Sequence, residues 1–388
     1  MNTATLAFTP VNHTGWGSSQ RLLSIVQEMA PASILVVTDP VLEEIGLVHK
    51  VIEPLLQANY HVEVYTDISP EPPLEVGENL VSFTRSKQVD LVIGIGGGSA
   101  LDLAKLTAVL SVHEGKVEDY LNLTGKREIT QKGVPKILIP TTSGTGSEVT
   151  NISVLSLEST KDVVTHSHLL ADVAIVDPEL TLSVPARVTA ATGVDALTHA
   201  IEAYLSTQGN PVTDGLALHA IKLINRSIRT AVEDGSNREA RSDMSYGSYL
   251  AGLAFFNAGV GGVHALAYPL GGQFHLAHGE SNAVLLPYVM DYIRSRATKR
   301  LADVLKALEP GAVVQSEEEA SIQCVQLLKQ LVQDIGIPTT LREFQIPESA
   351  IEPLTNDATK QTRLLARSPM PLEQKDIQAI YTAAFYGQ

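Results

Sequence analysis

The stretch Asp90-Leu-Val-Ile-Gly-Ile-Gly-Gly-Gly-Ser99 decides how this chain folds. Its first half is an apolar, β-branched run that is typical of a buried strand, and its second half is a glycine turn that leads into a helix. Glycines let the main chain approach phosphate oxygens, and the free N–H groups at a helix start bind anions. The spacing departs from G-x-G-x-x-G, so a tight structural turn is the alternative.

Similar apolar runs occur on both sides of this stretch, and amphipathic segments separate them. Apolar strands that alternate with helices indicate a parallel sheet covered on both faces. We therefore predict a Rossmann-like α/β domain over residues 1–180. The other predicted strands are Ser33–Thr38, His61–Tyr65, Lys136–Pro140 and Val173–Asp177. The predicted helices between them are Trp16–Met29, Gly46–Ala58 and Ser99–Leu110.

Beyond residue 180 the strand patterns give way to apolar residues at helical spacing, which predicts an all-helical domain over residues 181–388. An uncharged stretch, Leu250–Gly272, has nearly the length of a membrane span, but its glycines and Pro269 favour a broken, buried helix. The predicted helices are Pro185–Leu205, Pro211–Val232, Arg238–Phe256, Glu280–Ile293 and Glu317–Ile335.

Two further segments carry polar groups at strand ends. Pro140–Glu148 is rich in hydroxyls and glycines, and Asp39 follows the first predicted strand. Ligands of parallel sheets bind at the carboxyl ends of strands, so both can contact a nucleotide. Asp39 can accept a hydrogen bond from a ribose hydroxyl and would repel a 2′-phosphate. The alternatives are a polar loop with a helix cap and a turn aspartate before Pro40.

Four residues in the second half have the character of metal ligands: Asp195, His199, His264 and His278. Asp195 and His199 are four positions apart, so both lie on one face of a helix. One oxygen and three nitrogens suit Fe(II) or Zn(II), and the lack of a thiolate argues against a zinc-finger type of site. A metal together with a nicotinamide cofactor indicates redox chemistry at a carbon–oxygen bond.

Composition narrows the possible partners. The 388 residues carry a net charge of −15, which argues against nucleic acid and anionic membranes as partners. The single cysteine, Cys324, excludes a disulfide within the chain. The first ten residues lack the basic and apolar regions of a signal peptide, and we expect a cytoplasmic protein.

Together these motifs resemble the iron-containing (group III) alcohol dehydrogenases over nearly the whole chain. The resemblance rests on the following segments: Gly96–Ser99 with Asp102 and Lys105, Pro140–Glu148, Asp177-Pro178, Gly193–Glu202 and His278-Gly279. It implies a dehydroquinate synthase-like architecture, with an N-terminal dinucleotide-binding domain and a C-terminal helical domain. It also implies a homodimer or larger homo-oligomer.

By motif position, the metal ligands implied by the resemblance are Asp195, His199, His264 and His278. The implied NAD contacts are Asp39, Gly96, Gly97, Gly98, Ser99, Asp102, Thr141, Thr142, Thr145, Val154 and Lys161. One position departs from the family. Many members have a histidine four residues after the third ligand, where this chain has Tyr268. His275 is near in sequence, so Tyr268 and His275 are the candidates for proton transfer.

We therefore expect an NAD-dependent, Fe(II)-dependent dehydrogenase that interconverts a primary alcohol or short diol and its aldehyde. One alternative is a lyase of the dehydroquinate synthase type, which needs basic residues to hold a phosphorylated substrate. The apolar 250–270 segment offers none. The other alternative is a non-catalytic nucleotide-binding protein with a structural metal. A nicotinamide absorbance assay with alcohols, with and without Fe(II), distinguishes all three.

Overall fold

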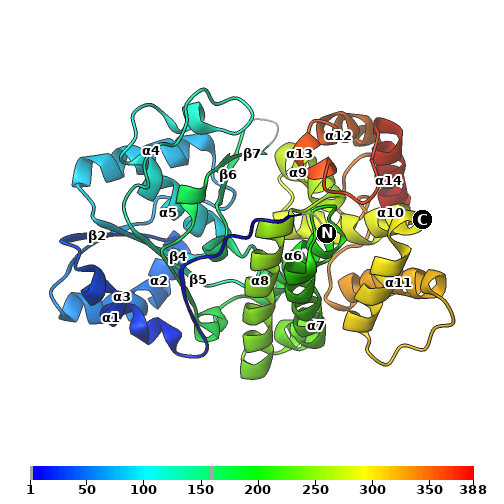
Figure 1. Ribbon diagram of the computed structural model, residues 1–388, viewed down its shortest axis with the longest axis horizontal. Helices are drawn as coiled ribbons and strands as arrows, with labels where there is room; N and C mark the ends of the chain where they lie inside the picture. Colours follow the sequence, from blue (N-terminus) through cyan, green and yellow to red (C-terminus); the bar gives the residue numbers. More distant parts are fainter. Residues whose placement is uncertain (1–2, 158–160) are drawn as a thin grey trace. The chain divides into compact units, whose positions relative to one another are not determined.

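The computed structural model describes residues 3–157 and 161–388 (Figure 1). The chain forms two compact units. One is an α/β unit made of residues 8–142 and 146–183, and the other is a helical unit made of residues 1–7, 143–145 and 184–388.

The α/β unit is built on a six-stranded sheet in the order β1-β8-β5-β4-β2-β3, in which every pair of neighbours is parallel. A separate antiparallel pair, β6-β7, belongs to the same unit. The strands are β1 (Val11–Thr14), β2 (Ser33–Val37), β3 (His61–Tyr65), β4 (Leu91–Gly96), β5 (Lys136–Pro140), β6 (Ile152–Ser156), β7 (Lys161–Thr165) and β8 (Val173–Val176).

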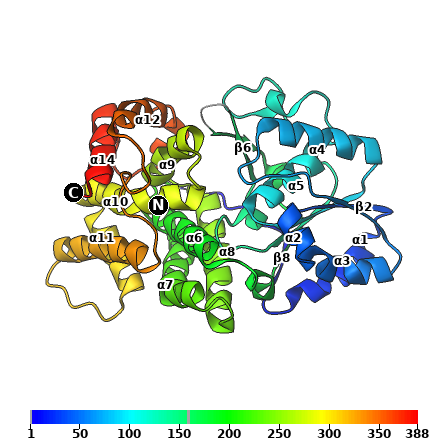
Figure 2. The same cartoon turned by 180° about the vertical axis from the view of Figure 1, so that it is seen from behind.

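Helices cover both faces of the six-stranded sheet, as Figures 1 and 2 show for opposite views. Alternate residues of β2 enter different cores: Ile34 packs with α1 and α3, whereas Leu35 packs with α4 and α5. This two-sided burial explains the continuous apolar runs of the strands. The helices are α1 (Leu22–Met29), α2 (Pro40–Glu44), α3 (Leu47–Gln57), α4 (Leu74–Lys87) and α5 (Gly98–Leu110).

Strands β2 and β4 mark the point where the direction of winding reverses. They are neighbours in the sheet, but the chain leaves β2 toward α2 and α3 on one face and leaves β4 toward α5 on the other. Such a switch point opens a crevice outside the carboxyl ends of the two strands, where ligands of open α/β sheets bind. Asp39 and the Gly96–Ser99 turn follow these two strand ends.

The described residues of the helical unit form nine α-helices. The described residues after Val176 contain no strand, as the sequence predicted. The helices are α6 (Ala186–Leu205), α7 (Pro211–Glu233), α8 (Arg238–Ala258), α9 (Gly262–Phe274), α10 (His278–Leu308), α11 (Glu317–Asp334), α12 (Ile351–Ala358), α13 (Thr362–Leu365) and α14 (Gln374–Tyr386).

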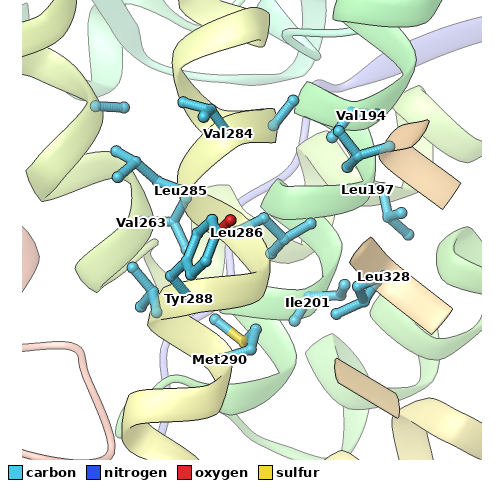
Figure 3. Packing of buried hydrophobic residues seen from close by; sticks show 14 of the residues in the cluster. Val194, Leu197, Ile201, Val263, Val284, Leu285, Leu286, Tyr288, Met290 and Leu328 are labelled. Carbon is cyan, nitrogen blue, oxygen red and sulfur yellow. The ribbon is translucent and has the colours of Figure 1, made fainter. Parts of the chain in front are cut away.

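The centre of the helical unit is a dry core shared by α6, α9 and α10. Figure 3 shows Leu197 and Ile201 of α6 close to Leu286 of α10, with Val263 of α9 beside them. All four side chains are fully buried. Because interiors are close-packed, this core holds the three helices in one fixed arrangement.

The boundaries of several predicted elements differ from those in the structure. The predicted helix Glu280–Ile293 extends over His278–Leu308, although Pro287 lies inside it. The predicted break in the 250–272 stretch is present, since α8 ends at Ala258 and α9 begins at Gly262 with a bend of 105°. By length and composition this bent pair is the single candidate for a membrane span in the described chain, and no straight helix qualifies.

Candidate active site

The four predicted metal ligands lie together in the helical unit. One potential ligand atom from each of Asp195, His199, His264 and His278 lies within 4.8 Å of the others. Three helices supply them, because α6 carries the first two, α9 carries His264 and α10 begins at His278. Asp195, His199 and His264 are buried, and the His278 side chain is 26% exposed.

Helix α6 presents Asp195 and His199 on one face, as their four-residue spacing predicts. The distance from Asp195 Oδ2 to His199 Nδ1 is 3.9 Å. Burial raises the pKa of Asp195, but the three histidines and a hydrogen bond from Asn282 outweigh it, so this pKa lies below its ordinary value. Burial lowers the pKa of His199 to about 4, and the Asp195 carboxylate only partly opposes this. The pair is therefore a carboxylate beside a neutral imidazole at neutral pH.

His264 is held from behind by Glu202, a buried residue that we did not single out from the sequence. Its Oε2 lies 2.6 Å from His264 Nδ1, and its Oε1 accepts a 2.7 Å hydrogen bond from the Val263 main-chain N–H. The other ring nitrogen, His264 Nε2, lies 3.8 Å from Asp195 Oδ1. Glu202 follows His199 by three residues on α6, and this helical spacing was a usable signal in the sequence.

Asn282 also lies at the site and was also missed. Its Nδ2 donates a 2.7 Å hydrogen bond to Asp195 Oδ1 and lies 3.3 Å from Nε2 of both His264 and His278. His278 Nε2 is itself 3.6 Å from Asp195 Oδ1. Asn282 is one helical turn after His278 on α10, so its approach to the ligands again follows from spacing along a helix.

These residues fit a divalent metal ion. The distances between Asp195 oxygens and histidine nitrogens are 3.6, 3.8 and 3.9 Å, below twice the usual bond length of roughly 2.0–2.1 Å. Among the described residues, His199 Nδ1 and Asn282 Oδ1 are buried side-chain atoms without a hydrogen-bond partner. Unpaired buried polar atoms are rare, and His199 Nδ1 lies among oxygen and nitrogen donors that suit Fe(II) or Zn(II).

The two candidates for proton transfer have different surroundings. Tyr268 is 8% exposed, and its ring centroid lies 5.9 Å from that of His278. His275 is exposed and adopts a left-handed conformation, with φ of 53°, where α9 ends. The structure therefore brings Tyr268 beside the ligand cluster, whereas no described contact links His275 to it.

The predicted phosphate loop has the geometry that close approach to a ligand requires. A Cβ on Gly96 would lie 2.7 Å from the Ala100 Cβ, so only glycine fits there. A Cβ on Gly97 would meet nothing closer than Thr142 Oγ1 at 3.5 Å, and Gly98 opens helix α5. The main chain of this turn is thus free for an anion at the start of a thirteen-residue helix.

Asp39 caps a helix with one carboxylate oxygen, and its other oxygen lies near the predicted phosphate loop. Its Oδ1 accepts a 3.0 Å hydrogen bond from the Leu42 N–H and caps α2. Its Oδ2 would be 3.6 Å from a Cβ on Gly96, so the second oxygen points toward the phosphate loop. A residue that caps a helix with one oxygen keeps the other for a ligand.

The remaining predicted cofactor contacts lie in different places. Ser99 and Lys161 both contact Glu71: the Glu71 N–H donates a hydrogen bond to Ser99 Oγ, and the Glu71 carboxylate pairs with Lys161 at 3.0 Å. Thr141 is buried, and its N–H donates to Gly96 O at 2.9 Å. Thr145 is half-buried and belongs to the helical unit, together with Ser143 and Gly144.

Asp102 has a more internal position than a cofactor contact needs. Its carboxylate accepts hydrogen bonds from the Ser147 hydroxyl and from the Val154 N–H, and it pairs with buried Lys105 at 2.9 Å. The half-buried Val154 thus touches Asp102 through its main chain. These contacts attach the segment after β5 to helix α5.

Comparisons with known proteins explain why these motifs occur together. A family model described as iron-containing alcohol dehydrogenase matches residues 10–178, and one for the C-terminal part of the Fe-containing alcohol dehydrogenase family matches residues 189–385. The chain belongs to the iron-containing alcohol dehydrogenase family. The enzyme is therefore an oxidoreductase that interconverts alcohols and aldehydes, and nothing in the comparisons supports a lyase or a non-catalytic protein.

The enzyme is similar over its full length to proteins of known activity. It is 66% identical to Long-chain-alcohol dehydrogenase 1 of Geobacillus thermodenitrificans, over 100% of this chain and 98% of that protein. It is 38% identical to 1,3-propanediol dehydrogenase of Klebsiella pneumoniae, over 90% and 91% of the two chains.

Solved structures share the fold. A crystal structure of a 1,3-propanediol oxidoreductase matches with a TM-score of 0.94 at 35% identity, over 99% of this chain and 100% of that chain. A sulfoacetaldehyde reductase from Bifidobacterium kashiwanohense, solved in complex with NAD⁺, matches with a TM-score of 0.88 at 28% identity, over 99% of each chain.

Proposed function

We propose that this NAD-dependent, iron-dependent alcohol dehydrogenase acts on primary alcohols and their aldehydes, and that Asp195, His199, His264 and His278 hold its iron. The observation that carries the assignment is the convergence of these four ligand atoms within 4.8 Å. A bound divalent ion supplies Lewis-acid polarisation of the alcohol or carbonyl oxygen. Asp195 contributes the negative charge that offsets part of the charge of the ion.

The α/β unit binds the dinucleotide in this proposal. The Gly96–Ser99 turn and the start of α5 receive the phosphates, because their main-chain N–H groups are accessible to an anion. Asp39 accepts a hydrogen bond from the ribose through Oδ2 and disfavours a 2′-phosphate. Thr141, Thr142, Thr145, Val154 and Lys161 complete the cofactor contacts, and Asp102 supports them from the interior. Residues 1–180 then form the NAD-binding domain and residues 181–388 the metal-binding domain.

Proton transfer completes the reaction. An alcohol must lose its hydroxyl proton as the hydride leaves its carbon, so a side chain or a water chain must carry that proton away. Tyr268 shapes the substrate pocket, and His275 acts as the relay to solvent. The exposure of His275 supports the relay, because a relay must exchange protons with water.

The substrate is a primary alcohol, and we include long aliphatic alcohols as well as short diols. The 66% identity to a long-chain-alcohol dehydrogenase supports the longer substrates, and the 38% identity to a 1,3-propanediol dehydrogenase supports the shorter ones. The uncharged 250–270 segment, which contains His264, favours neutral substrates over phosphorylated ones.

The test is the change in nicotinamide absorbance with a panel of primary alcohols, from ethanol through 1,3-propanediol to long aliphatic chains. We expect turnover that depends on added Fe(II) and that prefers NAD to NADP, with the His264→Ala variant as the inactive control. Turnover that is indifferent to Fe(II) and to chelation would contradict the proposed metal centre. A lack of turnover with every alcohol and aldehyde would contradict the proposed substrate class.

We further propose a cytoplasmic homodimer or larger homo-oligomer without nucleic-acid or membrane partners. The net charge of −15 argues against binding to nucleic acid and to anionic membranes, because both are negatively charged. Light scattering coupled to size-exclusion chromatography measures the oligomeric state, and a monomer at micromolar concentration would contradict it. Cell fractionation measures the location, and recovery with membranes would contradict it.

A further inference from the structure

Glu202 is a buried carboxylate on the same face of α6 as the two ligands of that helix. It follows His199 by three residues and Asp195 by seven, and it is 4% exposed. Within the described part of the chain, its one ion-pair partner is His264. A carboxylate is costly to bury unless hydrogen bonds compensate it, so the contacts of Glu202 indicate why it is there.

Both oxygens of Glu202 are used at the start of α9. Oε1 accepts the Val263 N–H at 2.7 Å, while Oε2 accepts the His264 main-chain N–H at 3.4 Å and faces His264 Nδ1 at 2.6 Å. The N-cap residue of α9 is Gly261, which has no side chain to cap the helix. A Cβ on Gly261 would lie 3.4 Å from Glu202 Oε1, so glycine leaves room for the carboxylate. Glu202 thus caps α9 from a different helix.

The contact with Nδ1 also decides where the imidazole proton lies. An ionised carboxylate only accepts hydrogen bonds, so in the neutral ring of His264 the proton lies on Nδ1 and the lone pair on Nε2. Nε2 is the nitrogen that lies toward Asp195, at 3.8 Å from Oδ1. A carboxylate behind a metal-binding histidine orients the ring, fixes its tautomer and strengthens its donor nitrogen.

We propose that Glu202 is the positioning residue of the metal centre: it fixes His264 as the Nδ1–H tautomer and thereby sets the metal affinity of the site. The inference rests on the proposed function, since it takes His264 as a ligand. It goes further by assigning control of that ligand to a residue outside the four.

Glutamine at position 202 separates this role from ordinary packing. It has nearly the same shape but only one acceptor oxygen. If that oxygen faces His264 Nδ1, the amide NH₂ meets the Val263 N–H; in the opposite orientation, the NH₂ donates to Nδ1 and moves the imidazole proton to Nε2. The Glu202→Gln variant must therefore lose either the cap or the correct tautomer. Glu202→Asp keeps the negative charge on a side chain that is one methylene shorter, so it is the conservative variant.

The experiment measures Zn(II) affinity of the full-length protein by competition with a chromophoric chelator, because Zn(II) is redox-inert. The imidazole ¹⁵N signals of the metal-free protein report the tautomer, and the His264 signals are assigned by their loss in His264→Ala. Asp243→Asn is the matched control, since Asp243 is also a buried carboxylate of the helical unit but hydrogen-bonds to Arg226. We expect Glu202→Gln to lose about 10–100-fold in affinity and the Nδ1–H signature, with a smaller loss in Glu202→Asp and none in Asp243→Asn.

Two outcomes would overturn the proposal. Either Glu202→Gln binds Zn(II) as wild type does while His264→Ala does not, or Glu202→Gln loses Zn(II) affinity although His264 keeps its Nδ1–H tautomer, which would assign the loss to the cap of α9. Should Glu202→Gln fail to fold, Glu202→Asp takes its place, and wild-type affinity in that variant counts against the proposal. Unchanged Zn(II) affinity in His264→Ala would instead show that the proposed metal centre is wrong.

Discussion

Lys105 and Asp102 form a buried ion pair in the α/β unit, with 2.9 Å between Nζ and Oδ1 and no exposure of the lysine side chain. The ammonium also donates to Ser147 O and to Ile152 O, so the pair joins α5 to the segment that follows β5. Desolvation lowers the pKa of Lys105, and Asp102 opposes this shift. Because a buried charge is costly without a partner, loss of either residue would leave the other charge unpaired beside the proposed cofactor loops.

Lys105→Met should strongly destabilise the protein. The substitution removes the charge partner of Asp102 and leaves main-chain acceptors unpaired, which costs about 3–5 kcal/mol for a buried pair. Lys132→Met is the control, because Lys132 pairs with Asp172 at the surface and should lose less than about 1 kcal/mol. The measurement is the free energy of unfolding in urea, and equal stability of the two variants would refute the prediction.

Glu148→Gln should gain stability relative to wild type as the pH rises. Burial raises the pKa of Glu148 to about 7, while its own main-chain N–H and Lys105 oppose the shift. A carboxyl with a raised pKa contributes favourably to the free energy of unfolding. This contribution is complete below pH 4.5 and is lost as the pH rises through 7. The variant should therefore improve on wild type by up to about 3 kcal/mol between pH 5 and 8. Parallel stability profiles for the two proteins would show that the prediction is wrong.

His278→Ala should abolish both metal binding and turnover while the helices persist. The substitution removes one of four protein ligands, so elemental analysis should find little iron and circular dichroism should be unchanged. Retention of stoichiometric iron with near-normal turnover would contradict the ligand assignment.

Acidification should release the metal from wild type, and protonation of His199 should not begin that release above about pH 4. Protons compete with the metal for ligand nitrogens. The pKa of His199 is lowered to about 4, so this residue stays neutral from pH 7 to 5 and begins to compete only near pH 4. The measurement is the iron content after equilibration at each pH. Protonation of His199 well above pH 4, seen by NMR of the metal-free protein, would contradict the prediction.

Asp39→Gly should shift cofactor preference toward NADP. The variant removes both the ribose acceptor and the charge that repels a 2′-phosphate, so kcat/KM for NADP relative to NAD should rise. It also removes the α2 cap, but glycine is tolerated at the N-cap, so stability should fall by only about 0.3 kcal/mol. Asp39→Asn keeps a cap and removes only the charge, so it is the matched variant. A preference ratio that is unchanged in both would eliminate this role for Asp39.

Tyr268 and His275 should separate into a specificity role and a proton-transfer role. Tyr268→Phe should change the preference among alcohols more than the pH dependence, because its ring lies beside His278. His275→Ala should slow turnover mainly at low pH, with normal metal content. The measurements are pH–rate profiles with a short and a long alcohol. A His275→Ala profile that overlays wild type would remove His275 from the mechanism.

Local patterns predicted much of the fold and of the metal site. The apolar runs of β2, β4, β5 and β8 are buried on both sides, and α6 displays Asp195 and His199 as their spacing requires. Strand β1 was missed because three of its four residues, Val11–Thr14, have polar side chains and because its pairing partner is the distant strand β8. The antiparallel pair β6-β7 was missed because both strands mix polar with apolar residues and form a separate two-stranded sheet.

The surroundings of the ligands were less predictable, because they depend on contacts between helices. Glu202 and Asn282 stand at helical spacing from His199 and His278, but only the packing of α6 against α9 and α10 brings them to His264 and Asp195. His275 precedes His278 by three residues, so the sequence suggested that it lies near the metal ligands. In the structure it follows the last residue of α9 and is exposed. Short-range periodicity determines which face a side chain occupies, and tertiary packing determines what it meets.

The proposed metal ligands come from three helices, α6, α9 and α10, and this distribution would link iron supply to the lifetime of the protein. An ion bound at Asp195, His199, His264 and His278 would clamp α6, α9 and α10 together, and any ligand that binds only the folded state stabilises it by mass action. Molecules made under iron starvation would then open more often and be degraded sooner. The abundance of the enzyme would follow the availability of its metal without any regulatory site.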